Sequence, residues 1–258
     1  MNGPDKGPNQ ESGMTEQLVF TRLLNDVLRA PANALLNAVH APAQDPSAPI
    51  NNTFAMEFLV FLFLLGLFLL VRSRLSVESP GGLQHLVELG HEFFDTQGHD
   101  IIGHGSEPFV PIVATLAYFI LFANLIGLIP GFESPTADAV VPLGLALVTF
   151  FYYNWHGLRK QGPIGYAKHF MGPVWWLSPL MFIIEIISHL ARAMSLTIRL
   201  YANIFAGDMV TLVFFSLIPL GLPIVFLGLH VFVSLLQAYI FALLATIYIA
   251  GAVAEEHH

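Results

Sequence analysis

Long apolar runs are the feature of this sequence that most limits its fold. Residues 54–71 contain one charged side chain, Glu57, and residues 108–130 contain none. An α-helix needs about 20 predominantly apolar residues to cross a bilayer, and these runs approach or exceed that length. The mean hydropathy is +0.67 and 11% of the residues are charged, against about 25% in an average soluble protein. The sequence therefore predicts an integral membrane protein.

The expected fold is an all-α polytopic membrane protein with about five membrane-inserted helices. A single membrane domain covers 54–258, and a polar leader, 1–53, precedes it. The predicted spans are about 54–72, 108–130, 139–157, 177–217 and 220–254. Pro219 and Pro223 separate the last two segments, which are too long for upright spans and must form a tilted pair or leave the bilayer at one end.

Two shorter segments predict interfacial helices. In 17–40, apolar side chains recur near helical spacing opposite polar ones; the apolar set is Leu18, Phe20, Leu24, Val27 and Leu28, and the polar set is Arg22, Asn25, Asp26 and Arg29. A second amphipathic helix is expected after Ser79 and Pro80. Both are too polar to span a membrane.

Basic residues near the span ends predict the orientation. Arg72 and Arg74 follow the first span, and Arg159, Lys160 and Lys168 lie between the third and fourth. Cytoplasmic loops carry an excess of Lys and Arg. With five spans, the N-terminal leader is therefore expected outside and the C-terminal "AEEHH" inside.

Charged residues inside the fourth apolar segment require an explanation. An arginine at the centre of a membrane helix costs about 2.5 to 3.5 kcal/mol on insertion scales. At about 100° per residue, the polar residues of this segment fall on one stripe about 80° wide; they are Glu185, Ser188, Arg192, Ser195, Arg199 and Asn203. Asp208 lies off this stripe. Such a stripe is expected to face water or a partner.

The last helix carries a second polar stripe, formed by His230, Ser234, Gln237 and Tyr248. A histidine changes charge near neutral pH, so His230 could pass protons together with an acid such as Asp208 on the neighbouring helix. Two purely structural interpretations stay open. Arg199 could form an ion pair with Glu185 or Asp208. His230 and Gln237 could serve only to hold the helices together through hydrogen bonds.

Other function classes find little support. There is no cysteine for disulfides or thiolate metal sites, and no basic stripe with interleaved aromatics for nucleic acid. His91 begins "HEFFD", which lacks the second histidine of a zinc-protease helix, and no phosphate-binding loop is present. A metal cluster of His85, His91, His99 and His104 has no fixed ligand geometry. We expect neither an enzyme nor a bound metal or cofactor.

Three segments carry a resemblance to a known family. "SLTIRLYANIFAGD" (195–208), "FANLIGLIPGFESPTAD" (122–138) and "LHVFVSLLQAYIFALLATIYIAGA" (229–252) resemble subunit a of the rotary F-type ATP synthases. The similarity covers roughly 54–257 in consistent order. It implies a stationary, non-catalytic subunit that provides two aqueous half-channels for protons, in the inner membrane of a bacterium. Its implied partners are the ring of c subunits, the peripheral-stalk b subunits and membrane lipid.

The resemblance also implies roles for single residues. Arg199 matches the arginine that faces the passing carboxylates of the ring, with Asn203 one turn later and Gln237 approaching the arginine from the last helix. Asp208 and His230 match the half-channel that opens outside, and Glu185 and Ser188 match the one that opens to the cytoplasm. A guanidinium keeps its proton, so Arg199 would attract ring carboxylates without relaying protons.

Two alternatives to this function are kept. A secondary transporter could bind an anionic substrate through Arg199, although the chain has no second copy of the Arg199 segment, as an internal repeat would require. A structural membrane scaffold would leave Arg199 replaceable.

Overall fold

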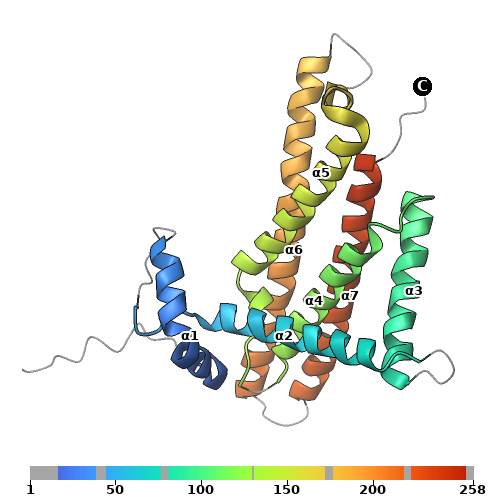
Figure 1. Ribbon diagram of the computed structural model, residues 1–258. Coiled ribbons are helices and arrows are strands. Elements are labelled where there is room, and N and C mark those ends of the chain that lie inside the picture. Colours follow the sequence, from blue (N-terminus) through green and yellow to red (C-terminus); the bar gives the residue numbers. More distant parts are fainter. Residues whose placement is uncertain are drawn as a thin grey trace, which may run out of the picture.

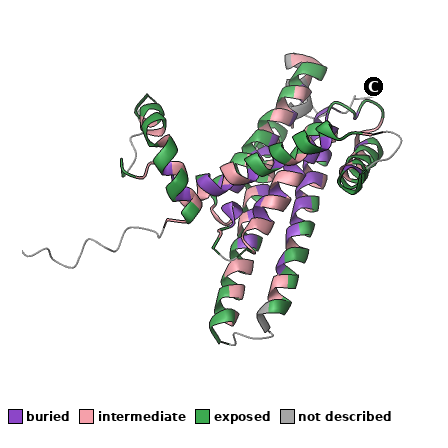
Figure 2. Cartoon of the chain, turned by 60° about the horizontal axis from the view of Figure 1, so that its bottom comes forward, coloured by how far each residue is buried: buried purple, intermediate pink, exposed green. Residues whose placement is uncertain are grey.

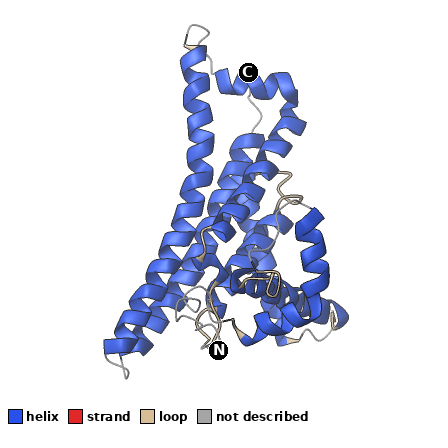
Figure 3. Ribbon diagram, turned by 90° about the vertical axis from the view of Figure 1, so that its left-hand side faces the viewer, coloured by secondary structure: helices blue, strands red, loops and turns tan. Residues whose placement is uncertain are grey.

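A computed structural model describes residues 17–38, 45–76, 81–129, 131–171, 177–217 and 222–253. These ranges hold seven α-helices, one short 3₁₀ helix and no strand (Figure 3). The predicted all-α class is confirmed. Expectations for 1–16, for Ser79, Pro80, Pro219 and for the tail 254–258 lie outside the described residues.

The helices follow the chain in simple order. They are α1 (Val19–Ala38), α2 (Asn52–Ser73), α3 (Gly82–Ile102), α4 (Val110–Ile126), η1 (Pro135–Ala137), α5 (Val140–Met171), α6 (Ser178–Leu217) and α7 (Leu222–Val253). Each predicted span overlaps one of α2, α4, α5, α6 and α7. Within the described ranges, α2, α6 and residues 224–253 of α7 are long and apolar enough to cross a membrane, and α4 is a shorter apolar helix. The count of five spans stays a prediction.

The α4 helix is shorter than the predicted segment 108–130. It ends at Ile126 because the chain turns at Gly127 and folds back, so that the Ser134 hydroxyl donates to the Ala123 carbonyl at 3.0 Å. A Cβ on Gly127 would lie 2.7 Å from the Ser134 Cβ. Only glycine permits so close an approach of the two backbones.

The α5 helix is longer than predicted. The expected end was 157, but helical structure continues to Gly162, where a positive φ of 74° bends the chain before a further helical stretch. Apolar periodicity ends with the aromatic residues near 155, whereas the backbone stays helical through the polar turns that follow. A drop in hydropathy therefore marked the end of the apolar part and not of the helix.

The two C-terminal helices are much longer than a bilayer is thick. With 40 residues, α6 extends about 60 Å, and the 32 residues of α7 extend about 48 Å, compared with a hydrocarbon core of about 30 Å. Figure 1 shows α2 running across α6 and α7. If the 22-residue α2 stands upright, α6 and α7 are strongly inclined, which agrees with the predicted tilted pair.

The core lies where α4, α5, α6 and α7 cross, whereas the C-terminal end of α6 and the N-terminal end of α7 are largely exposed (Figure 2). Leu196, Leu200 and Ile204 form the buried line of α6 and pack with Phe241 of α7. The buried face of α7 is rich in small residues, namely Ala238, Ala242, Ala245 and Ala252. Small side chains let membrane helices approach closely, so α7 forms the centre of the bundle.

The N-terminal helix α1 packs its apolar residues against the start of α2. The sequence placed Asn25 on its polar face, but Asn25 is buried. Its side-chain amide donates to the Ile50 carbonyl and its oxygen accepts from the Ile50 N–H, both at 3.0 Å. A buried backbone group needs a partner, and Asn25 supplies both partners where the chain enters α2.

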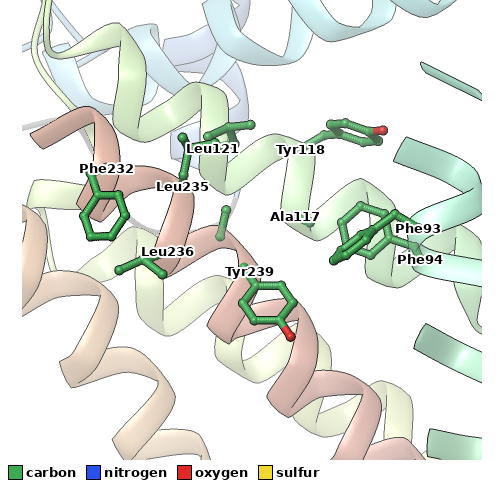
Figure 4. Close-up of a pocket in the computed structure, with 10 residues that line it drawn as sticks. Phe93, Phe94, Ala117, Tyr118, Leu121, Phe232, Leu235, Leu236 and Tyr239 are labelled. Atoms are coloured by element: carbon green, nitrogen blue, oxygen red, sulfur yellow. The ribbon is translucent and has the colours of Figure 1, made fainter. Parts of the chain in front are cut away.

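An apolar pocket of about 390 Å³ lies between α3, α4 and α7 (Figure 4). Its walls include Phe93 and Phe94 from α3, Tyr118 from α4, and Phe232 and Tyr239 from α7. These aromatic side chains attach α3 to the bundle. The lining holds no acid, base or amide, so this pocket offers no route for a proton.

Candidate functional site

The polar stripe predicted on α6 is present at the edge of the buried face. Side chains two turns or one turn apart contact each other along it: Arg192 donates to Glu185 at 3.2 Å, and Arg199 donates to Ser195 at 3.2 Å. The stripe lies beside the buried line that includes Leu196 and Leu200. It is therefore open on one side and supported by the bundle on the other.

Arg199 has no acidic partner in the described part of the chain. Its guanidinium is partly exposed and makes its hydrogen bond with the Ser195 hydroxyl. Glu185 and Asp208, the two acids considered for a structural ion pair, contact other groups. The structure therefore shows no ion pair of Arg199 with Glu185 or Asp208.

Glu185 lies at the other end of the stripe between two bases. Its Oε1 is 3.2 Å from Nη2 of Arg192 and 3.2 Å from Nε2 of His189. Ser188 is half-exposed on the same side of α6. Arg192, the other arginine of the stripe, is therefore paired with Glu185.

Asn203 connects α6 to α7 next to the arginine. Its side-chain amide donates to Oε1 of Gln237 at 2.8 Å. The resemblance implied that Gln237 approaches Arg199, but among the described residues its hydrogen bond is with Asn203. Gln237 is only 1% exposed in the interface of the two helices, whereas Arg199 extends along the outer edge of α6 toward Ser195.

Asp208 and His230 come together across the same interface. Oδ1 of Asp208 is 3.6 Å from Nδ1 of His230, and His230 is buried. Gly207 makes this approach possible, because a Cβ there would lie 3.3 Å from Nδ1 of His230. At 3.6 Å the two groups are too far apart for a hydrogen bond, but a small side-chain movement or one bridging water would let a proton pass between them.

A cavity of about 240 Å³ opens beside this pair. Its lining includes Asn203, Gly207, Thr211 and His230. Farther along the same face of α7, three buried polar atoms have no hydrogen-bond partner among the described residues; they are Nε2 of His230, Oγ of Ser234 and Nε2 of Gln237. Each buried polar atom without a partner destabilises the folded protein by about 1 to 3 kcal/mol unless water binds to it. This row of atoms is the kind of surface on which buried water binds.

The stripe predicted on α7 continues toward Glu185. Tyr248 lies under Arg192, with 5.8 Å from the guanidinium carbon to the ring centre. The two polar stripes therefore meet twice, at Asn203 and Gln237 and again at Arg192 and Tyr248. Together they form a polar seam, defined here as the α6 stripe from Glu185 to Asn203, Asp208, and the α7 stripe from His230 to Tyr248.

Sequence reasoning missed two groups of residues. His189 lies next to the stripe and bonds to Tyr153 of α5, and its spacing of four residues from Glu185 was the available signal. Asn124 of α4 accepts a 2.5 Å hydrogen bond from Thr136 of η1. An asparagine inside the uncharged run 108–130 was the signal there.

The four histidines considered as a metal cluster do not converge. His99 and His104 have ring centres 5.3 Å apart, but in the described ranges no group of three or more His, Cys, Asp or Glu side chains could hold a metal ion.

Comparison with known proteins gives a consistent result. A family model described as ATP synthase A chain matches residues 54–250. Proteins named ATP synthase subunit a are similar over most of the chain: that of Koribacter versatilis is 59% identical over 95% of this chain and all of its own length. That of Solibacter usitatus is 50% identical over 91% and all of its length. That of Helicobacter hepaticus is 42% identical over 80% and 94% of its length.

Proposed function

The chain belongs to the ATP synthase A chain family, as a membrane subunit that carries protons in the ATP synthase complex, and we propose that its polar seam forms the proton path. The seam would provide two half-channels that load and unload carboxylates on a rotating ring of c subunits. The subunit itself makes and breaks no covalent bond. The transporter alternative is not favoured, because the family model matches residues 54–250 and the identity with the Koribacter versatilis protein extends over 95% of this chain.

The observation that supports this proposal is that Arg199 has no acidic partner among the described residues. A permanent cation in a membrane helix needs a counter-charge, and the described residues leave it none within ion-pair distance, while Glu185 and Asp208 are engaged elsewhere. An ionised carboxylate from a second protein would supply the missing charge. Because Arg199 lies on the open edge of α6, a ring passing that edge could present one carboxylate after another.

The outer half-channel is assigned to Asp208 and His230. The 240 Å³ cavity, the 3.6 Å approach of the two side chains and the unpartnered Nε2 of His230 support a hydrated route there. A proton would enter at Asp208, pass to His230 and reach a ring carboxylate near Asn203. Once neutral, that carboxyl group can leave Arg199 and move into lipid.

The inner half-channel is assigned to Glu185 and Ser188, at the opposite end of the stripe. A returning carboxyl group would release its proton there, since Arg199 favours the ionised form on its next approach. Arg199 keeps its own proton and so separates the two routes.

The proposed setting is the inner membrane of a bacterium, with the N-terminus outside and the C-terminus in the cytoplasm. Figure 1 shows α1 and α3 at opposite ends of α2, which would place them on opposite sides of a membrane that α2 crosses. The positive-inside rule and Arg72 in the last turn of α2 support a cytoplasmic position for the α3 end. Peripheral-stalk b subunits are the further proposed partners.

Cross-linking tests the assignment of the ring. The chain has no cysteine, so Ser195→Cys in the intact complex places one thiol beside Arg199 for a photoactivated thiol reagent. The main expected adduct is a small proteolipid with a mid-membrane Asp or Glu. Phe61→Cys, on the exposed side of α2, is the control and should give little of it. If assembled complex yields no such adduct from Ser195→Cys, the proposed ring contact is wrong.

Gly207 offers a milder test of the outer route. Gly207→Ala should lower ATP-driven proton pumping about threefold, a barrier increase of under 1 kcal/mol, because the new methyl group would press on His230. Alanine favours the helix by about 1 kcal/mol, so the loss would not come from unfolding. Gly228→Ala, with nothing within 4 Å, should leave pumping unchanged. Equal rates for the two variants would contradict the assigned route.

A further inference from the structure

Glu185, His189 and Tyr153 form a continuous row of polar contacts where α5 meets α6. Nε2 of His189 is 3.2 Å from Oε1 of Glu185, and its Nδ1 is 2.9 Å from the Tyr153 hydroxyl. Both nitrogens of the imidazole are therefore engaged. Tyr153 is 2% exposed and His189 7% exposed, so bulk water does not compete for these bonds.

The surroundings of His189 are aromatic on one side and charged on the other. The ring of Phe150 is 6.3 Å away, edge to face. The titratable and charged groups near it in the described residues are Tyr153 from α5, Glu185 and Arg192 from α6, and Tyr248 from α7, whose ring centre is 6.0 Å from that of Tyr153. Glu185 is thus the acid with which His189 can share a proton.

A tyrosine hydroxyl is a partner that suits both charge states of an imidazole. In one neutral tautomer of His189 the hydroxyl donates to Nδ1 and Nε2–H faces Glu185. In the other tautomer Nδ1–H donates to the hydroxyl, and Nε2 is free to accept a proton from Glu185, since the hydroxyl can act as donor or acceptor. His189 can therefore gain or lose a proton while it keeps its hydrogen bond with Tyr153.

We propose that His189 is a proton-binding residue of the inner half-channel, held against Glu185 by the Tyr153 hydroxyl. The proposal rests on the proposed function, which assigns Glu185 to that route. A proton on Oε1 of Glu185 moves to Nε2 of a His189 already protonated at Nδ1, which leaves a carboxylate and an imidazolium. In the described residues Oε2 of Glu185 has no hydrogen bond or ion pair, so the next proton can arrive and leave there.

The expected effect lies in the pH dependence of proton release. An imidazolium 3.2 Å from Oε1 favours the charged form of a carboxyl group. Removal of His189 takes this charge away, so proton release at this site should depend differently on the cytoplasmic pH.

The experiment measures passive proton conduction in vesicles stripped of the catalytic sector, with the complete membrane sector present and the cytoplasmic-side pH varied. His189→Leu should move the acid-side midpoint up by about one unit. His189→Gln keeps a hydrogen-bond donor next to Glu185. Its conduction at alkaline pH should therefore match that of the unmodified protein, while its acid-side midpoint should stay shifted as in His189→Leu. Tyr153→Phe should shift the midpoint in the same direction by less. Tyr152→Phe, whose hydroxyl has only a 3.5 Å contact, should match the unmodified protein.

An unchanged midpoint in both His189 variants would overturn the proposal, whatever happens to the amplitude, because a purely structural histidine would lower conduction at every pH alike. Membranes that carry Arg199→Ala and keep the catalytic sector test the underlying function separately, by ATP-driven proton pumping. If that variant still pumps, the proposed function fails; if only the His189 midpoint is unchanged, the failure is limited to His189.

Discussion

In membranes carrying Arg199→Ala, the rate of ATP-driven proton pumping is expected to fall more than about 100-fold. This corresponds to an activation barrier higher by at least about 2.7 kcal/mol. Without the guanidinium, no positive charge stabilises the ionised ring carboxylate as it passes from one half-channel to the other. The measurement is fluorescence quenching by a pH-sensitive dye in inverted vesicles, with assembly confirmed by the amount of intact complex. Normal pumping in assembled complex would disprove the central assignment.

Two companion variants sharpen this result. Arg199→Lys keeps one positive charge but loses the planar fork of donors, so pumping should stay severely reduced. Arg192→Ala removes the other arginine of the same stripe, which is already paired with Glu185, and should cost no more than a few-fold. Passive conduction in Arg199→Ala membranes should persist, because the variant removes the separator between the routes and leaves the routes themselves intact.

The second large effect is expected at Asp208 and His230. Asp208→Asn and His230→Leu should each lower both pumping and passive conduction by about tenfold or more, since a blocked outer route stops flow in either assay. The two variants act on one path, so the double variant should be little worse than the more severe single one. This pattern differs from Arg199→Ala, in which passive conduction survives.

His99→Leu is the matched control, because it removes an exposed histidine of α3 that is not part of the polar seam. It should conduct normally. If His230→Leu conducts as well as His99→Leu, protons do not pass through His230. Strictly additive losses in the double variant would show that Asp208 and His230 act on separate steps.

Local periodicity predicted the part of the site that a single helix determines. Glu185, Arg192, Ser195 and Arg199 share one edge of α6 because the helical repeat puts them there, and the contacts along that edge follow from spacing alone. The approximate ends of α2 and α6 followed in the same way from apolar length and flanking polar residues.

Contacts between helices could not be predicted in this way. Gln237 bonds to Asn203 and not to Arg199 because the packing of α6 on α7 decides which side chains are buried together. His189 meets Tyr153 only because α5 packs on α6. The early end of α4 depended on Ser134 folding back onto Gly127, which is a close approach between segments that sequence spacing does not encode.

The continuity of α6 has a mechanical consequence. Glu185 and Asp208 lie about 35 Å apart along one unbroken helix axis, and this axis is inclined toward the membrane plane when α2 stands upright. The proposed entry and exit would then be separated sideways as well as in depth. A ring carboxylate that binds its proton near one end of α6 and releases it near the other must move sideways between them. The inclination of α6 would therefore convert proton flow driven by the membrane potential into rotation of the ring.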